Sequence, residues 1–181
     1  GHNGAGKTTL IKLMLGLTRP TGGEIAVLGE APDSRRAVAT RRAVGYLPES
    51  IAFHGAMSAR QTLRFYAGLI GENAKRCEEL LAAVGLAEVA GNRVRTFSKG
   101  MRQRLGIAQA LLGQPKILLL DEPTTGLDPA LRRWLWQLVD EQREAGTTVV
   151  ISSHSLHEIE SHADRIGILE HGRLKVFGSL D

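Results

Sequence analysis

Short apolar runs recur along the chain and predict a series of β-strands. Continuous runs of this kind, bounded by Gly, Pro or polar residues, are typical of strands buried in a parallel sheet. They lie at residues 24–28, 43–47, 116–120, 147–152, 166–169 and 174–177. The last two flank the turn His171-Gly172, so we expect two short strands around that turn.

Between these runs, apolar residues return at the three- and four-residue spacing of an α-helix. Leu10, Leu13, Met14 and Leu17 share one face and predict a helix over residues 8–17. Capping residues and terminal glycines predict further helices at about residues 59–69, 74–84, 99–113 and 129–145. The segment Ser155-Leu156-His157-Glu158 predicts another capping box.

This alternation of strands and helices indicates an α/β fold with a parallel sheet. Between about residues 50 and 115 the pattern is mainly helical, so we expect a helical subdomain inserted there. A chain of 181 residues is the size of one domain, and we expect a single domain over residues 1–181.

Composition excludes few functions but disfavours some. Only 4% of residues are aromatic and the net charge of +4 is scattered along the chain, so we expect no nucleic acid partner. Cys77 is the single cysteine, which excludes an internal disulfide and suggests a reducing compartment. Its charged neighbours predict an exposed helix face. No apolar run approaches the roughly 18 residues of a spanning helix.

The first eight residues match a phosphate-binding motif. The pattern G-x-x-x-x-G-K-[ST] is the P-loop, whose glycines let the backbone wrap around phosphate at the start of a helix. Lys7 is expected to reach the β- and γ-phosphates, and the Thr8 hydroxyl to bind Mg²⁺. Because a P-loop normally follows a buried strand, we also expect strands that precede Gly1 in a longer protein. The predicted nucleotide contacts are Gly1, Asn3, Gly4, Ala5, Gly6, Lys7, Thr8 and Thr9.

A second candidate lies where an apolar run ends in two acidic residues, Asp121 and Glu122. Such strand ends deliver carboxylates to the ligand-binding edge of a parallel sheet. Taken alone, this segment reads equally well as a strand followed by a polar turn. Together with the P-loop it predicts a nucleotide site, in which Asp121 holds Mg²⁺ largely through water and Glu122 orients the attacking water. The two motifs indicate a P-loop NTPase.

A third motif lies between these two. Ser98 and Gly100 open the helix predicted at residues 99–113, and Ser-x-Gly is by itself a common cap. In this position, however, the segment resembles the signature of ABC ATPases, usually written L-S-G-G-Q, with departures at Phe97, Lys99 and Met101. The resemblance implies that Ser98 and Gly100 bind nucleotide phosphate, and the charge of Lys99 suits that role.

The rest of the chain follows the order of motifs in that family. Residues 125–128 resemble the D-loop, and His154 resembles the switch histidine that senses the γ-phosphate. Glu49 stands after Pro48, where the family normally has the Q-loop glutamine that touches Mg²⁺ and signals to the membrane subunit. Glutamate at this position resembles the exporter-type branch. The resemblance thus implies Glu122, His154 and Lys7 as catalytic residues and Thr8, Asp121 and Glu49 as metal-binding residues.

The resemblance covers essentially the whole chain and implies an ABC-type ATPase core, N-terminally truncated. It implies an ATP-binding and ATP-hydrolysing subunit of an ABC transporter, with ATP and Mg²⁺ as cofactors. It also implies a head-to-tail dimer with a second ATPase subunit and a separate integral membrane permease, at the cytoplasmic face of the cell membrane. A narrower resemblance, in residues 1–4, 48–53 and 98–112, is to the ATPase subunit of the copper-processing transporter for nitrous oxide reductase maturation.

Three other classes of protein fit less well. Ribosome-acting ABC ATPases usually carry paired ATPase domains in one long chain, and this chain shows one. DNA-repair relatives insert long coiled coils or zinc-binding cysteines, for which residues 49–98 are too few and Cys77 is single. A non-catalytic regulatory domain conflicts with the presence of all four charged or catalytic side chains, Lys7, Asp121, Glu122 and His154.

Overall fold

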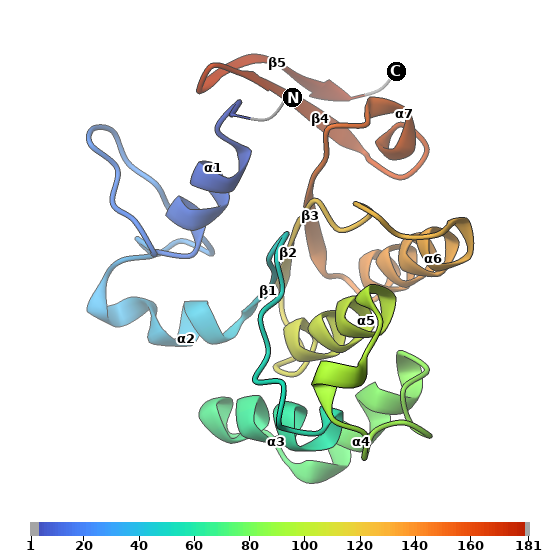
Figure 1. Ribbon diagram of the computed structural model, residues 1–181. Coiled ribbons are helices and arrows are strands. Elements are labelled where there is room, and N and C mark those ends of the chain that lie inside the picture. The colour runs from blue at the N-terminus through green and yellow to red at the C-terminus, as the bar shows by residue number, and fades with distance from the viewer. Residues whose placement is uncertain (1–3, 180–181) are drawn as a thin grey trace.

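A parallel β-sheet lies at the centre of the molecule (Figure 1). The structure is a computed structural model and describes residues 4–179. The sheet contains β1 (Val44–Leu47), β2 (Ile117–Asp121) and β3 (Thr148–Ser152), paired in the order β1-β2-β3. In register, Leu47 pairs with Leu120 and Asp121 with Ser152. The carboxyl ends of the strands therefore meet at one edge, where ligands bind in open α/β sheets.

Helices lie on both sides of this sheet. α1 (Lys7–Met14) and α2 (Val38–Arg42) lie on one side, and α5 (Lys99–Ala110) and α6 (Pro129–Glu144) lie on the other (Figure 1). The predicted α/β fold with a parallel sheet is confirmed, as are the helices predicted to begin near Thr8, Lys99 and Pro129.

Two further helices, α3 (Ala59–Ile70) and α4 (Ala74–Ala83), pack beside α5 at the end of the molecule opposite β4 and β5 (Figure 1). The predicted capping box is present: Ser58 Oγ accepts the Gln61 N–H at 3.1 Å, and Gln61 Oε1 accepts the Ser58 N–H at 2.9 Å. Gly71 caps the carboxyl end of α3 with a φ of 82°, a conformation that glycine adopts readily because glycine has no Cβ. The local sequence therefore determines where these helices begin and end.

The remaining elements are short. They are the 3-10 turns η1 (Arg35–Ala37) and η2 (Val94–Thr96), helix α7 (Leu156–Ile159), and the antiparallel strands β4 (Arg165–Glu170) and β5 (Arg173–Ser179). The predicted turn at His171-Gly172 joins β4 to β5, and the Gly172 N–H donates to the Ala5 carbonyl at 3.0 Å. The hairpin thus contacts the P-loop. None of the helices within residues 4–179 is long and apolar enough to cross a membrane.

One hydrophobic core joins the sheet to the helices beside it, and it depends on glycines at two contacts of α5. A Cβ on Gly106 would lie 2.7 Å from Leu47 Cδ1 and 2.8 Å from Ile51 Cδ1. A Cβ on Gly45 of β1 would collide with the carbonyl oxygen of Ala110. Helix and strand therefore approach more closely than any side chain at these positions allows. The fully buried side chains of this core include Leu47, Leu63, Leu81, Leu105, Leu118 and Leu120.

The strand predicted at residues 24–28 is wrong. Only Val27 forms a bridge there, with Glu30, through hydrogen bonds of 2.9 and 3.2 Å. Leu28 and Gly29 both have positive φ, 51° and 83°, so the chain reverses at once instead of extending along a neighbouring strand.

Two smaller predictions are also wrong. Ser155 precedes α7 but its side chain makes no capping hydrogen bond. The other half of the box is also absent, because the Ser155 N–H donates to Ser153 Oγ at 3.0 Å and Glu158 pairs with Arg132 of α6 at 2.7 Å. Cys77 is fully buried in α4, not part of an exposed face, and burial raises the pKa of its thiol. Lys75 and Glu79 of the same helix are exposed, while Cys77 packs in the core.

Gly45→Ala is expected to lower the free energy of unfolding by about 1–3 kcal/mol, because the added methyl forces β1 and α5 apart. Urea denaturation followed by circular dichroism measures the change. Gly68→Ala is the matched control, since a Cβ at this exposed position of α3 meets no atom within 4 Å. It should stabilise the helix by roughly 0.5–1 kcal/mol. Equal effects of the two substitutions would contradict the packing argument.

Candidate nucleotide-binding site

The P-loop forms a turn that runs directly into α1. Gly4 and Gly6 have φ of 80° and 101°, and Gly6 occupies the N-cap position before Lys7. The first N–H groups of a helix have no partner within it and favour an anion. Gly4, Ala5 and Gly6 thus lie where the sequence predicted them, at the start of α1. Gly1 and Asn3, predicted in the same motif, lie outside the described residues.

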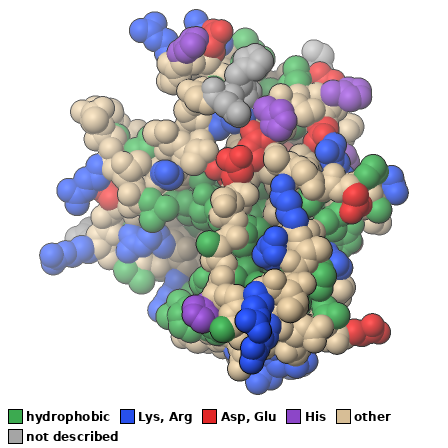
Figure 2. Space-filling model, in the orientation of Figure 1, with side chains coloured by type: hydrophobic (Ala, Val, Ile, Leu, Met, Phe, Trp, Pro, Cys, Tyr) green, Lys and Arg blue, Asp and Glu red, His purple; other side chains and the backbone are tan. Residues whose placement is uncertain are grey.

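A cavity of about 320 Å³ opens beside this turn. It brings together three segments that are far apart in the sequence: the P-loop, the loop after β1 and the end of β2. Figure 2 shows acidic side chains gathered at this end of the sheet, above a stripe of Lys and Arg over α5. The cavity is lined by Gly4, Ala5, Gly6, Lys7, Thr8, Thr9, Glu49 and Glu122.

Asp121 is held between the P-loop and β3. Thr8 Oγ1 donates to Asp121 Oδ2 at 2.9 Å, and Ser152 Oγ donates to Asp121 Oδ1 at 2.5 Å. The carboxylate is 1% exposed, so these hydrogen bonds replace the water it loses. Sequence reasoning missed Ser152; the signal for it is its place at the end of the strand next to β2.

Glu122 lies between two cationic or potentially cationic groups. Lys7 Nζ lies 2.5 Å from Glu122 Oε1, and His154 Nδ1 lies 2.7 Å from Glu122 Oε2. Burial raises the pKa of the Glu122 carboxyl, but the hydrogen bonds and charges of Lys7 and His154 outweigh it, so the pKa lies below its ordinary value. The structure therefore brings together the three residues that the sequence assigned to catalysis.

Glu49 joins the same cavity from the loop after β1, and its side chain is exposed. Glu49 and Glu122 are the acidic residues that line this cavity. Oxygen donors from Thr8, Asp121 and Glu49 are the ligand type that Mg²⁺ prefers. No cluster of three or more His, Cys, Asp or Glu residues is placed to hold a metal within residues 4–179.

Ser98 and Gly100 lie at the start of α5 and do not line the P-loop cavity. Ser98 Oγ accepts the Met101 N–H at 3.2 Å, so it caps the helix as predicted. A Cβ on Gly100 would approach Leu131 Cδ2 to 2.8 Å, which explains glycine there. Lys99 extends over Gly126. One chain thus presents the P-loop and the signature segment as two separate surfaces.

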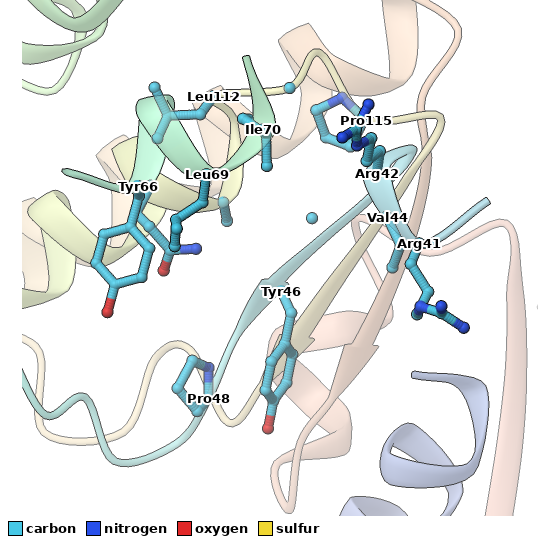
Figure 3. Close-up of a pocket in the computed structure, with 14 residues that line it drawn as sticks. Arg41, Arg42, Val44, Tyr46, Pro48, Tyr66, Leu69, Ile70, Leu112 and Pro115 are labelled. Atoms are coloured by element: carbon cyan, nitrogen blue, oxygen red, sulfur yellow. The ribbon is translucent and has the colours of Figure 1, made fainter. Parts of the chain in front are cut away.

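A second cavity of about 310 Å³ lies between β1 and the ends of α3 and α5 (Figure 3). Leu69 and Ile70 of α3 lie across it from Val44 and Tyr46 of β1. Its lining residues include no carboxylate, so it lacks the chemistry of a metal–nucleotide site. Burial, together with the charge of Asp121, raises the pKa of Tyr46.

The fold and these motifs are those of an ABC-type P-loop nucleotide-binding domain, and comparison with known proteins places the chain in a family. The family model described as ABC transporter matches residues 1–125, so the chain belongs to the ABC transporter family. Its relatives include the bacitracin transport ATP-binding protein BcrA of Bacillus licheniformis, which is 44% identical over 96% of this chain and 57% of BcrA.

Two solved structures share the fold. The structure of an ATP-binding subunit of an ABC transporter matches with a TM-score of 0.90 and 33% identity, over all of this chain and 77% of that one. The structure of cbiO1 from Clostridium perfringens, described as part of the ABC transporter complex cbiONQ, matches with a TM-score of 0.81 and 30% identity, over 99% of this chain and 75% of that one. The chain spans 55% to 60% of the length of four bacterial relatives it matches.

Glu122→Gln is expected to make stability less sensitive to acid. Because folding lowers the pKa of Glu122, the stabilisation it contributes is present above the ordinary value of 4.5 and is lost as the pH falls through the lower, folded value. The free energy of unfolding of the wild type should therefore fall more steeply between about pH 5 and about pH 3 than that of the variant. Urea denaturation at several pH values measures both slopes. Glu144→Gln, at an exposed position of α6, is the control, and equal slopes for Glu122→Gln and wild type would contradict the assignment.

Proposed function

We propose that this chain is the ATP-binding and ATP-hydrolysing part of an ABC transporter, and that it drives movement in a separate membrane permease. The observation that carries the proposal is the meeting of the P-loop with the carboxylates at the end of β2. Lys7 contacts Glu122, and Thr8 contacts Asp121, across more than a hundred residues of sequence. This is the arrangement that phosphoryl transfer requires, in which positioned charges surround the phosphates.

Each side chain has a proposed role. The P-loop N–H groups and Lys7 bind the phosphates, and Thr8, Asp121 and Glu49 hold Mg²⁺. Mg²⁺, when bound, supplies positive charge that offsets the charge of the β- and γ-phosphates. Thr8 Oγ1 donates to Asp121 Oδ2 at 2.9 Å, so the two side chains that would hold Mg²⁺, Asp121 largely through water, lie next to each other. Ser98 and Gly100 bind the phosphates of a nucleotide held by a second ATPase subunit.

Lys7 links nucleotide binding to catalysis in this proposal. The phosphates of ATP compete with Glu122 for the Lys7 ammonium, which now lies 2.5 Å from the carboxylate. Transfer of Lys7 to the phosphates removes one of the groups that lower the pKa of Glu122. Glu122 then becomes a better acceptor for a proton of the attacking water, while His154 still holds its other oxygen.

Head-to-tail pairing follows from the separation of the two surfaces. Ser98 and Lys99 are exposed and stand apart from the P-loop cavity, so the signature segment of one chain cannot reach the nucleotide on its own P-loop. We therefore propose a dimer in which each nucleotide lies between the P-loop of one subunit and the signature segment of the other. The helix N-terminus of α5 then faces the phosphates.

We propose that the second cavity receives an apolar segment of the permease. Leu69 and Phe65 of α3, 62% and 55% exposed, form an apolar surface at this end of α3, and Leu69 lines the cavity. Pro48 lines this cavity while the next residue, Glu49, lines the P-loop cavity. One loop therefore contacts both the proposed nucleotide and the proposed permease, at the cytoplasmic face of the membrane.

The transported substrate is proposed on narrower grounds. The resemblance of residues 1–4, 48–53 and 98–112 supports a copper-processing transporter for nitrous oxide reductase maturation. The relative BcrA is named for bacitracin transport. Because the site described above is built for phosphate, the permease would select the cargo.

Glu122→Gln in the full-length protein is expected to bind ATP and remain a stable dimer, because it removes both the water-orienting carboxylate and the competitor for Lys7. Hydrolysis should fall by roughly 10²–10⁴-fold. Size-exclusion chromatography with light scattering, with and without ATP, measures the assembly. Lys7→Ala is the control and should lose tight ATP binding. A Glu122→Gln protein that binds ATP but stays monomeric would refute the head-to-tail dimer.

Leu69→Asp is expected to reduce co-purification of a multi-span membrane protein by about tenfold, because a buried carboxylate in an apolar contact is costly. The full-length tagged protein is isolated from native membranes and its partners are identified by mass spectrometry. Leu174→Asp, on a β5 residue of similar exposure, is the matched control and should keep the partner. Equal recovery with both variants would exclude this cavity as the contact.

The transported substrate is tested in the purified complex. Stimulation of ATP hydrolysis by copper supports the copper-processing transporter, and stimulation by bacitracin contradicts it.

A further inference from the structure

The backbone of Glu122 has a conformation that its neighbours must maintain. Its φ is 48°, in the left-handed region that non-glycine residues rarely adopt. The next residue is Pro123, and a residue before proline normally prefers the extended region. Strain of this kind persists only when the surrounding structure over-determines the conformation, and it concentrates at functional sites.

Hydrogen bonds hold this strained backbone on both sides, and the Thr125 N–H donates to the Glu122 carbonyl itself at 3.2 Å. On the amino side, the Glu122 N–H donates to Ser152, at 3.0 Å to the hydroxyl and 3.2 Å to the carbonyl. On the carboxyl side, Gln103 Nε2 donates to the Pro123 carbonyl at 2.9 Å. The carbonyl only accepts hydrogen bonds, which identifies the amide nitrogen of Gln103 as the atom facing it. Gln103 is 6% exposed, so water does not replace this donor.

Gln103 belongs to α5, the helix that Ser98 opens. The side chain therefore connects the signature helix to the peptide that follows Glu122. Further along the same helix, Gly106 packs against Leu47 and Ile51, on either side of the loop that holds Glu49. α5 thus packs against the loop that holds Glu49 and donates a buried hydrogen bond to the peptide that follows Glu122.

We propose that Gln103 is a positioning residue for ATP hydrolysis: its amide holds the Pro123 peptide, keeps Glu122 in its left-handed conformation, and so aims the carboxylate. The inference rests on the proposed ATPase function and adds a route by which the position of the signature helix controls that carboxylate. Gln103 does not line the P-loop cavity, so it acts on the rate of hydrolysis and not on the affinity for ATP.

The test compares Gln103→Met with wild type in the full-length protein. Methionine has a similar length but no donor, which leaves the Pro123 carbonyl unsatisfied. We expect kcat to fall by roughly tenfold to hundredfold, as for other small displacements of a catalytic group, while the dissociation constant of ATP changes by less than about twofold. Gln142→Met is the control, because it makes the same change at a half-buried position of α6. This position is 13 residues, or roughly 20 Å of helix, beyond Pro129 at the start of α6. Both kcat and the dissociation constant of ATP should stay unchanged.

Two further measurements separate positioning from a general loss of structure. In a Glu122→Gln background, Gln103→Met should cause no additional loss of kcat, because its effect passes through Glu122. Gln103→Glu restores a donor only when its carboxyl is protonated, so its kcat relative to wild type should rise as the pH falls from about 8 to about 6. The ratio for Gln103→Met should not change with pH.

The outcomes distinguish this inference from the proposed function. If Gln103→Met hydrolyses ATP with the same kcat as the wild type, the inference is overturned and the ATPase assignment stands. A loss of kcat that adds fully to that of Glu122→Gln also overturns it. A wild-type protein that binds no ATP, or binds ATP without hydrolysing it even with its permease, overturns the proposed function and this inference with it.

Discussion

The ion pair between Lys7 and Glu122 joins two segments 115 residues apart, and the rest of the site is arranged around it. Both side chains are largely buried, with 13% and 7% exposed. Each charge therefore has a partner of opposite sign in a region where an unpaired charge would be costly. The hydrogen bond from Thr8 to Asp121 runs beside the pair, one residue further along α1 and one residue earlier in β2. These two contacts hold α1 against the sheet edge.

Helix α5 approaches the same carboxylate from the other side of the sheet. Its close contact with β1 is possible because Gly45 and Gly106 lack side chains, and interiors packed this tightly transmit displacement instead of absorbing it. Gln103 then links the helix to the peptide after Glu122. The carboxylate of Glu122, which we propose to be catalytic, therefore contacts the P-loop through Lys7, and the peptide that follows it contacts the signature helix through Gln103.

The loop after β1 extends this connection away from the nucleotide. Pro48 and Glu49 are adjacent in sequence but line different cavities: mainly apolar residues line the first, and the P-loop lines the second. In the proposed transporter, such a loop lets a contact with the permease alter the surroundings of Mg²⁺ and the phosphates. Glutamate in place of the family's glutamine adds a charge at this junction, so in the proposed transporter electrostatics would contribute to the coupling.

Features that depend on neighbours a few residues apart could be predicted from the sequence: the strands β1, β2 and β3, the capping box at Ser58, and the phosphate and carboxylate motifs. The other features depend on contacts between segments far apart in the chain. Residues 24–28 have strand-like composition, but a strand also needs a partner, and here the chain reverses at Leu28-Gly29. Ser152 and Gln103 form no motif, because a hydroxyl or an amide acquires a role only when strand register and helix packing bring it within hydrogen-bonding distance of Asp121 or Pro123.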